Sequence, residues 1–188
     1  MMRVLASLVA LAAFAVPASA APAKWTVDQA KSSLAFTVVV NGQAVNGKFS
    51  AFGALIAFDP ADLAHSSAKI TMGMDTAKTG DATRDAMLLK PDWFNILDFP
   101  QAVFQTTSFV LKGGNKFDAV GKLTLKGAAK DVTLPLTIDI TGNTAVAKGE
   151  VVLKRLDYAI GKSKDFAGDS PVGLNVKVMV NVTATRAK

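Results

Sequence analysis

Few side chains in this sequence of 188 residues could carry out covalent or metal chemistry. It has no cysteine, and its one histidine, His65, lies in the turn-like stretch DPADLAHSS, where we expect a surface position. A hydrolytic triad or a zinc site needs several such side chains close together. The stretch GDATRD contains acids and a glycine but lacks the regular oxygen-ligand spacing of a calcium loop. The residue types therefore predict neither an enzyme nor a metal site.

Two arginines beside carboxylates are the remaining polar candidates. Arg84 directly precedes Asp85, and Arg155 lies two residues before Asp157 in the stretch RLDYAIG. Each arginine can be structural, and Arg84 would then pair with Asp85 and hold a short helix to the rest of the fold. Alternatively, its guanidinium can bind a phosphate or carboxylate of a ligand, since its planar donors match such oxygens. The residues leave both interpretations open.

The stretch TRDAMLLKPDWFNILDFP, residues 83–100, contains eight large apolar side chains and does not have the pattern of a strand. Asp81 predicts the start of a short helix and Pro91 its end, and Asp92 predicts a second helical turn that ends before Pro100. Its apolar side chains can complete the core, or they can line and gate an apolar cavity. Both interpretations can hold together.

The elements that would position these residues are strands, because the dominant period of the sequence is two. Turn-rich stretches such as KGGNK (112–116) and TGN (141–143) predict hairpins between them. Pro135 lies inside an otherwise good strand, which predicts an edge, a bulge or a barrel seam there. The predicted strands lie near residues 32–40, 48–58, 68–74, 102–111, 117–125, 132–140, 144–156 and 172–185.

Eight strands joined by hairpins favour an antiparallel sheet that closes, because closure removes exposed edges. We predict an all-β, eight-stranded antiparallel barrel with one or two short helices at its mouth. Several strands are apolar on both faces, and the stretch 83–100 adds more apolar side chains. A small filled barrel needs less apolar surface than this, so we expect an interior that holds a slender ligand.

The N-terminus has the pattern of a secretory signal peptide. Met1 to Arg3 form a short basic start, residues 4–16 are apolar, and Ala18-Ser19-Ala20 provides a cleavage site. We therefore expect a signal peptide at residues 1–20, one domain at residues 21–188 and a periplasmic location. Without Arg3, 20 basic residues face 15 acidic ones, and the lysines near residues 112–130 alternate with Asp118 and Asp131. We interpret them as a solvated hairpin face rather than a nucleic-acid site, because no aromatic residues accompany them.

Five stretches succeed one another as in a known family: WTVDQAKSSLAF, VNGKFSAFGALIAFD, TAKTGDATRDAMLLKPDWFNILDFPQAVFQTTS, GKLTLKGAAKDVTLPL and RLDYAIG. The sequence resembles the YceI-like family of bacterial periplasmic proteins that bind polyisoprenoids and related lipids. The resemblance implies a lipocalin-like eight-stranded barrel with a long hydrophobic tunnel, no metal and no catalysis. Arg84, Asp85 and Leu88 fall on the helix motif of the family, and Phe94, Phe99-Pro100 and Phe104 on its aromatic block. Where members often carry histidines, this sequence has Lys31, Val40 and Met87, so its contacts with a ligand head group can differ.

We therefore expect a carrier that sequesters a long-chain isoprenoid or related amphiphilic lipid, with no cofactor. The alternatives are a solid barrel that binds another protein and a small outer-membrane barrel. Transient contact with a membrane or membrane proteins and a homodimer are further expectations, whereas nucleic acid is not an expected partner. The expected ligand-binding residues are Phe36, Val38, Phe49, Phe52, Ile70, Met72, Met74, Arg84, Met87, Leu88, Trp93, Phe94, Phe104 and Met179.

Overall fold

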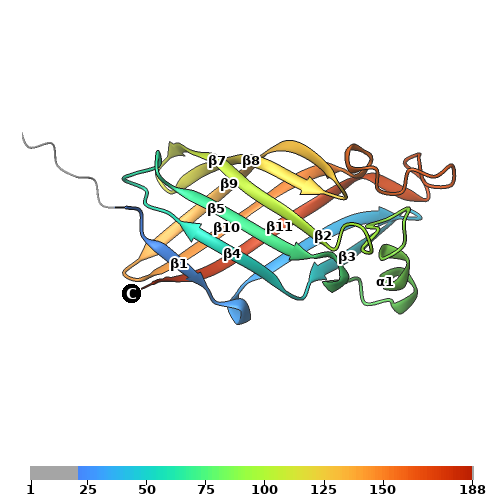
Figure 1. Cartoon of the computed structure of the whole chain (residues 1–188), viewed down its shortest axis with the longest axis horizontal. Coiled ribbons are helices and arrows are strands. Elements are labelled where there is room, and N and C mark those ends of the chain that lie inside the picture. Colours follow the sequence, from blue (N-terminus) through green and yellow to red (C-terminus); the bar gives the residue numbers. More distant parts are fainter. Residues whose placement is uncertain (1–20, 188) are drawn as a thin grey trace, which may run out of the picture.

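The computed structural model describes residues 21–187, and the expected signal peptide lies outside them. The described residues form strands, one α-helix and three short 3-10 helices (Figure 1). In chain order these are β1 (Lys24–Val27), η1 (Gln29–Lys31), β2 (Ser33–Val40), β3 (Gln43–Phe49), β4 (Phe52–Ala57), β5 (Ser67–Gly73), η2 (Met74–Thr76), β6 (Ala77–Lys78), α1 (Ala82–Leu88), β7 (Gln101–Gly113), β8 (Lys116–Leu125), β9 (Ala128–Thr141), β10 (Thr144–Lys154), η3 (Arg155–Tyr158) and β11 (Val172–Arg186).

The strands form a closed eight-stranded antiparallel barrel, as predicted. Three of the eight positions hold two strands separated by a short break, namely β1 with β2, β3 with β4, and β5 with β6. The ring continues through β7, β8, β9, β10 and β11, and β11 closes it by pairing with β1 near its C-terminal end and with β2 along its first part. Consecutive positions are joined mostly by short turns, so the barrel is an up-and-down meander.

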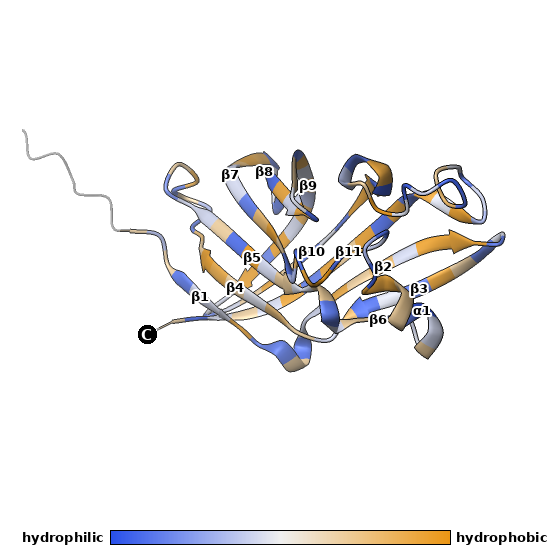
Figure 2. Cartoon of the chain, turned by 45° about the vertical axis from the view of Figure 1, so that its right-hand side comes forward, coloured by the Kyte–Doolittle hydropathy of each residue, from blue (hydrophilic) through white to orange (hydrophobic). Residues whose placement is uncertain are grey.

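Side chains alternate between the interior and the outer surface along each strand, which is the geometry that a period of two requires. On β11, Val178, Val180 and Val182 face the interior. Lys177 lies on the outer face, where its Nζ is 3.5 Å from the Glu150 carboxylate of β10. Hydrophobic and hydrophilic residues accordingly alternate along the ribbons in Figure 2. The alternation turns one side of every strand into the wall of an apolar interior.

One end of the barrel, which we call the aromatic end, is filled by Trp25, Phe58, Phe109 and Phe117. The Phe58 ring lies 5.1 Å from the Phe109 ring and 5.4 Å from the Phe117 ring, in edge-to-face contacts. The Trp25 Nε1 donates a hydrogen bond of 2.9 Å to the Phe58 carbonyl. The start of β1 and the C-terminal end of the chain lie at this end in Figure 1. Four buried aromatic residues therefore close this end from inside.

The opposite end, which we call the helix end, is covered by α1 with the turns that follow it and by residues 155–171 (Figure 1). The Asp81 Oδ1 accepts a 2.9 Å hydrogen bond from the Arg84 N–H, so Asp81 caps α1 as predicted. A second helix is absent from residues 91–98, which form turns. The Asp92 carboxylate instead accepts hydrogen bonds from the N–H groups of Lys162 and Ser163, both 3.1 Å, and from the Ser163 hydroxyl at 2.8 Å.

Three strands were not predicted. β1 and β6 are short, and most of β3 lies in the stretch NGQAVNG (41–47), whose asparagine and glycine residues are typical of turns. Gly47 of β3 pairs directly with Phe36 of β2, and a Cβ at Gly47 would lie only 2.2 Å from the Phe36 ring. The Phe36 ring therefore occupies the space that a side chain at position 47 would need. This explains why a glycine lies inside this strand.

Candidate functional site

The interior contains an apolar cavity of about 210 Å³ that runs between the two ends of the barrel. Its lining includes Trp25, Phe58 and Phe109 at the aromatic end and Leu125 and Leu153 toward the helix end. A cavity of roughly 150 Å³ lined by similar residues is large enough to hold a benzene molecule. The volume is therefore sufficient for a narrow hydrocarbon group.

The few polar groups of the lining are bonded within the protein. Thr106 is the one lining residue with a hydroxyl group, and its Oγ1 accepts a 2.8 Å hydrogen bond from the Ala68 N–H and donates to the Ala68 carbonyl at 3.3 Å. The Trp25 indole N–H is bonded to the Phe58 carbonyl. A polar ligand group placed here would lose its bonds to water without gaining a partner, which is unfavourable. The cavity therefore suits an apolar guest.

Several lining side chains face inward and yet are only half-buried. Met72, Phe104 and Val180 belong to this class, because part of their surface borders the cavity rather than other side chains. A close-packed core would bury them fully. The excess of apolar side chains seen in the sequence therefore corresponds to a hollow interior.

Five of the expected ligand-binding residues line this cavity. They come from β3, β5, η2 and β7, on neighbouring positions of the ring. Met72 and Met74 add flexible side chains that can adapt to a guest. The five are Phe49, Ile70, Met72, Met74 and Phe104.

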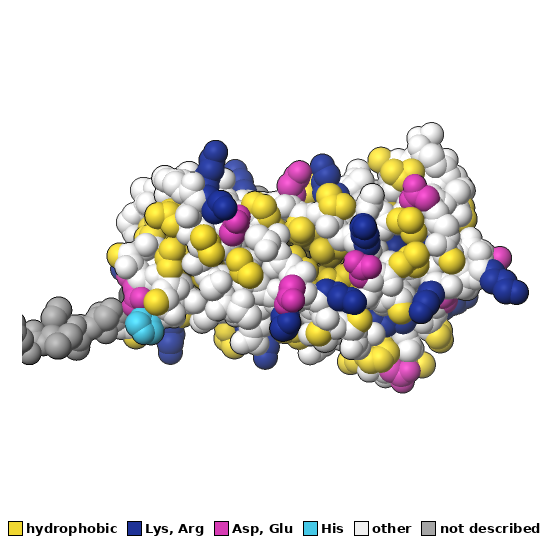
Figure 3. All heavy atoms as spheres, turned by 90° about the horizontal axis from the view of Figure 1, so that it is seen from above, with side chains coloured by type: hydrophobic (Ala, Val, Ile, Leu, Met, Phe, Trp, Pro, Cys, Tyr) yellow, Lys and Arg dark blue, Asp and Glu magenta, His cyan; other side chains and the backbone are white. Residues whose placement is uncertain are grey.

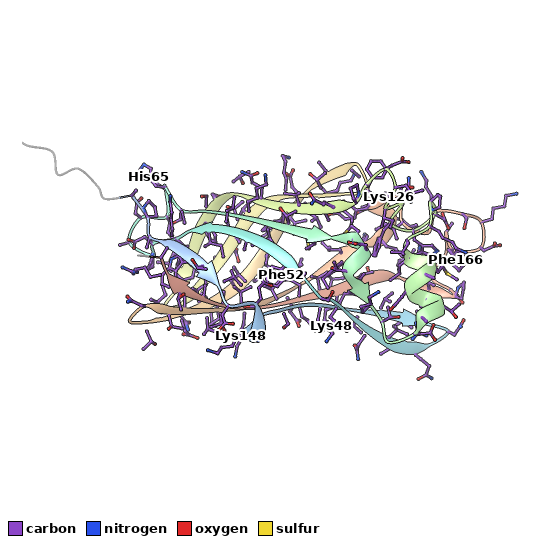
Figure 4. All side chains as sticks on the ribbon, turned by 60° about the horizontal axis from the view of Figure 1, so that its bottom comes forward. Lys48, Phe52, His65, Lys126, Lys148 and Phe166 are labelled. Carbon is purple, nitrogen blue, oxygen red and sulfur yellow. The ribbon has the colours of Figure 1, made fainter. Side chains whose placement is uncertain are left out.

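Four other expected residues on strands lie elsewhere. The Phe36 ring covers Gly47 and lies 5.7 Å from the Phe49 ring. Phe52 packs with Leu34 and Val182, and Phe52 in Figure 4 lies on the strand wall. Val38 packs in the cluster at the helix end. Met179 is placed on the outer face, because it alternates with the inward-facing Val178 and Val180.

The apolar side chains of the stretch 83–100 pack together at the helix end. Trp93 is buried against Tyr158, Ile160 and Val172, and its ring lies 5.1 Å from that of Phe166. The same cluster contacts lining residues of the cavity, among them Leu123, Leu125 and Leu153. The expected residues Met87, Leu88, Trp93 and Phe94 therefore complete the core and cover the helix end of the cavity, without lining it themselves.

Arg84 is held by its own helix. Its Nη1 lies 3.8 Å from the Asp81 carboxylate, and its Nε donates to the Thr79 hydroxyl at 3.4 Å. Asp85, the neighbour that we expected as its ion-pair partner, accepts bonds of 2.7 Å from both the N–H and the hydroxyl of Thr79. Hydrogen bonds from the Thr79 hydroxyl and then its N–H hold the pKa of Asp85 below its ordinary value. The structure thus supports a structural role for both side chains.

Arg155 organises the helix end to an extent that the sequence did not indicate. Its guanidinium is buried and donates to six backbone carbonyls, with no carboxylate of residues 21–187 in ion-pair distance. Burial lowers its pKa, and the charges of Asp169 and Asp92 oppose this. The acceptors are the carbonyls of Ile160 (2.9 Å), Gly161 (2.8 Å), Phe166, Gly168 (2.8 Å), Val172 (2.8 Å) and Gly173 (3.0 Å).

Lys126, in the turn between β8 and β9, is a second side chain that holds the helix end together by hydrogen bonds to backbone carbonyls. Its Nζ donates to the Ala159 carbonyl at 2.8 Å and to the Asp92 carbonyl at 3.1 Å. Burial lowers the pKa of this ammonium group, and the charge of Asp92 opposes the change. Lys126 and Phe166 both lie at the helix end in Figure 4, whereas His65 is exposed at the other end.

A closed eight-stranded antiparallel barrel with an apolar cavity is the architecture of a lipocalin-like binding barrel. The sequence matches the YceI-like domain over residues 25–184, so the chain belongs to the YceI-like family. The match confirms the family that the sequence resembles.

Known relatives agree with this assignment. The UPF0312 protein VPA0850 of Vibrio parahaemolyticus is 29% identical over 134 residues, which is 70% of this chain and 71% of that protein. The crystal structure of BcnA from Burkholderia cenocepacia is similar with a TM-score of 0.81 and 32% identity, over 85% of this chain and all of that chain. A polyisoprenoid binding domain from Saccharophagus degradans has a TM-score of 0.68 over 88% of this chain and 99% of its own, but its 12% identity shows a common fold alone.

Among residues 21–187, no three histidine, aspartate or glutamate side chains are grouped so as to hold a metal ion. Within the same part of the chain, no helix combines the length and the apolar composition needed to cross a bilayer.

Proposed function

We propose that this protein binds a long-chain isoprenoid or related amphiphilic lipid, such as a polyprenyl phosphate or an isoprenoid quinone, and carries it through the periplasm. The tail lies in the barrel cavity, and the protein performs no reaction on it. The observation that carries this proposal is the apolar cavity whose polar groups are already bonded to the protein backbone. Family membership and the fold shared with a polyisoprenoid binding domain support it.

The energetics of such binding follow from apolar burial. Each CH₂-sized group removed from water contributes about 0.8 kcal/mol, so one five-carbon isoprene unit contributes roughly 4 kcal/mol if it is fully buried. A short isoprenoid tail can therefore bind without any hydrogen bond. Selection would depend on the width and length of the guest, because the lining offers shape rather than polar contacts.

The structure favours this function over the two alternatives. A solid barrel would need its interior filled by its own side chains, whereas this interior contains a cavity. An outer-membrane barrel presents an apolar band to lipid. Here the outer faces of neighbouring strands carry ion pairs, such as Lys112 with Asp118 at 3.4 Å and Lys122 with Asp131 at 2.6 Å. These pairs also agree with the solvated hairpin face expected from the sequence.

A cavity-filling substitution tests the proposal. Ala147 of β10 lines the cavity, and the neighbouring Val146 alternates with it and lies on the outer face. We expect Ala147→Phe to lower the affinity for farnesol at least tenfold, since the new ring occupies space that the tail needs. Val146→Phe, as the matched control, should bind farnesol like the unmodified protein.

Two measurements complete the test. Farnesol binding is followed by the fluorescence of Trp25, which lines the cavity, in a Trp93→Phe background. Mass spectrometry of an organic extract of the purified protein identifies any lipid that it carries from the cell. If the unmodified protein takes up no isoprenoid and yields no lipid, or if Ala147→Phe binds as tightly as the control, the proposed function is wrong.

A further inference from the structure

The wall of the barrel is split between β9 and β10. These strands pair only where residues 144–149 meet residues 136–141. β9 remains paired with β8 down to Ala128, and β10 remains paired with β11 up to Lys154. Residues 128–135 of β9 and 150–154 of β10 therefore have facing edges with no ladder between them. We call this stretch the seam.

Pro135 and Gly149 lie where the seam begins. Leu136 and Gly149 form the last pair, and a Cβ at Gly149 would lie 2.1 Å from the Pro135 carbonyl oxygen, so this carbonyl faces β10. The N–H and C=O of one strand residue point to the same side, and proline has no N–H. Pro135 therefore has no N–H to donate to β10 at the point where the pairing of β9 with β10 ends. A barrel seam is one of the three features that the position of Pro135 in the sequence predicted, beside an edge and a bulge.

The other end of the seam is also bounded. Lys126, just before β9, donates its 2.8 Å hydrogen bond to the carbonyl of Ala159, just after η3. The turn before β9 and the segment after β10 are thus tied together above the seam. The seam is therefore an opening between the two strands, bounded at one end by Lys126 and Ala159 and at the other by Leu136 and Gly149.

The seam leads to the cavity. Val132 and Leu134 on its β9 side and Val151 and Leu153 on its β10 side all line the cavity. Figure 3 views the molecule from the side on which β7, β8 and β9 lie in Figure 1, and it shows a hollow near the middle of that face. Hydrophobic side chains form the floor of the hollow, and charged side chains surround it. A hydrocarbon tail could therefore reach the interior through the wall.

The charges beside the seam leave an excess of cations. Its two acidic residues are each paired across the neighbouring strand, Asp131 with Lys122 at 2.6 Å and Glu150 with Lys177 at 3.5 Å. Three lysines in or next to the seam are exposed and form no ion pair with any residue of the described chain. Lys154 lies on the β10 edge of the seam, and Lys148 lies just beyond its last pair, opposite Thr137. Lys130 of β9 pairs with the cavity-lining Leu123, so it is on the inward side of its strand, yet it is exposed where no neighbouring strand covers β9. Lys148 lies between the two ends of the molecule in Figure 4.

We propose that the seam between β9 and β10 is the portal through which the lipid enters the cavity, and that the three lysines in or next to it hold an anionic head group, a phosphate or a carboxylate, at this opening. This inference rests on the proposed function and adds the route and the class of head group. The tail enters between two strand edges that no ladder holds together, while the covering at the helix end stays in place. The lysines attract the anionic group by charge, and since they are exposed, this attraction weakens at high salt.

Crosslinks between introduced cysteines distinguish entry through the seam from entry at the helix end. They are specific because the sequence has no cysteine of its own. If the register of Leu136 with Gly149 continued, Thr133 would face Val152, and both residues are exposed. Thr133→Cys with Val152→Cys, joined by a short thiol crosslinker after folding, locks the seam. Asp92→Cys with Ser163→Cys locks the helix end, because these two side chains touch at 2.8 Å.

Uptake of a fluorescent farnesyl phosphate is then timed by stopped flow for each protein with and without its crosslink. We expect the seam lock to slow uptake at least tenfold and the helix-end lock to change it less than twofold. The portal is excluded if the helix-end lock slows uptake and the seam lock does not, if both slow it equally, or if neither does. If the proteins without crosslinks take up no lipid, the proposed function itself fails.

The head group is tested by removing charge. We expect Lys130→Gln with Lys148→Gln and Lys154→Gln to weaken farnesyl phosphate binding about tenfold, the combined effect of three exposed charge contacts. Farnesol, which has no charge, should bind both proteins equally. The control triple variant, Lys24→Gln with Lys48→Gln and Lys69→Gln, loses the same charge from β1, β3 and β5. An equal loss in the control, or an equal loss for farnesol, would show that the lysines of the seam do not bind the head group.

Discussion

The two ends of the barrel are held together by different forces. At the aromatic end, Phe58 is buried against the rings of Phe109 and Phe117, and all three sit on or next to paired strands. At the helix end, the covering segments are bonded mainly through polar side chains to backbone carbonyls, above all by Arg155 and Lys126. One end depends on packing and strand pairing, the other on one apolar cluster around Trp93 together with a small number of hydrogen-bonding side chains.

This difference predicts different dynamics. Packed aromatic residues between hydrogen-bonded strands open only when the barrel unfolds, whereas segments outside the strand ladders with many exposed residues, such as 162–170, open locally at lower cost. The aromatic end is therefore the fixed base of the cavity. The helix end and the adjacent seam are the parts that can move without the loss of the barrel.

The largest expected effect comes from breaking the fixed end. Phe58→Ala removes a buried ring that contacts two other rings, so we expect the free energy of unfolding to fall by about 3–5 kcal/mol. Urea unfolding monitored by far-UV circular dichroism measures it. Phe166→Ala makes the same change at the helix end, where Phe166 is only half-buried against Trp93, and should cost about 1–2 kcal/mol. Equal losses for the two variants would contradict the proposed difference between the ends.

A smaller effect on the whole protein is expected from Arg155→Met. The six carbonyls that the guanidinium binds would have to find water, so residues 155–171 should open. We expect the unfolding free energy to fall by about 2–4 kcal/mol and amide hydrogen exchange to rise in this segment first. Hydrogen-exchange mass spectrometry, read segment by segment, checks the location of the change.

Two variants act as controls for Arg155. Arg155→Lys keeps the charge but has too few donors in the wrong geometry to reach six carbonyls, so it should resemble Arg155→Met. Arg84→Met removes an arginine near the surface whose two partners are distant, the Asp81 carboxylate at 3.8 Å and the Thr79 hydroxyl at 3.4 Å, and it should cost less than about 1 kcal/mol. Exchange that rises evenly through β7 and β8 in Arg155→Met would argue against a local role.

Much of the fold could be predicted from the sequence, because alternation identifies strands that have one face on an apolar interior. The eight predicted segments correspond to the eight positions of the barrel. β3 escaped prediction because Asn41, Gly42, Asn46 and Gly47 are typical turn residues. Gly47 is nevertheless inside a strand, since only there can the Phe36 ring lie against it, and that contact joins residues from two strands. No pattern along the chain reveals it.

The site was predicted less completely than the fold. Met72, Met74 and Phe104 could be predicted as lining residues because they are large, apolar and on strands or their ends. Leu134 and Val151 of the β9 and β10 wall were missed, although alternation places them inside as well. Arg155 could not be understood from its neighbours, because its acceptors lie up to 18 residues away and are backbone carbonyls, which have no sequence signature.

The smallest expected effect concerns how α1 is attached at the helix end, and it depends on pH. Hydrogen bonds from the Thr79 hydroxyl and N–H hold the pKa of Asp85 below its ordinary value of 3.8. The carboxylate form is favoured in the folded protein, so this contribution is fully present above pH 3.8 and is lost as the pH falls through the lower, folded pKa. In a carbon-13 NMR titration we expect the Asp85 carboxyl to titrate below 3.8 and to move toward 3.8 in Thr79→Val, which keeps the N–H bond but loses the hydroxyl. Thr83→Val, on the exposed side of α1, should leave the titration unchanged. Should Asp85 titrate at its ordinary pKa in the unmodified protein, the bonds from Thr79 do not fix the helix, and the polar attachment of the helix end would rest on Arg155, Lys126 and Asp92.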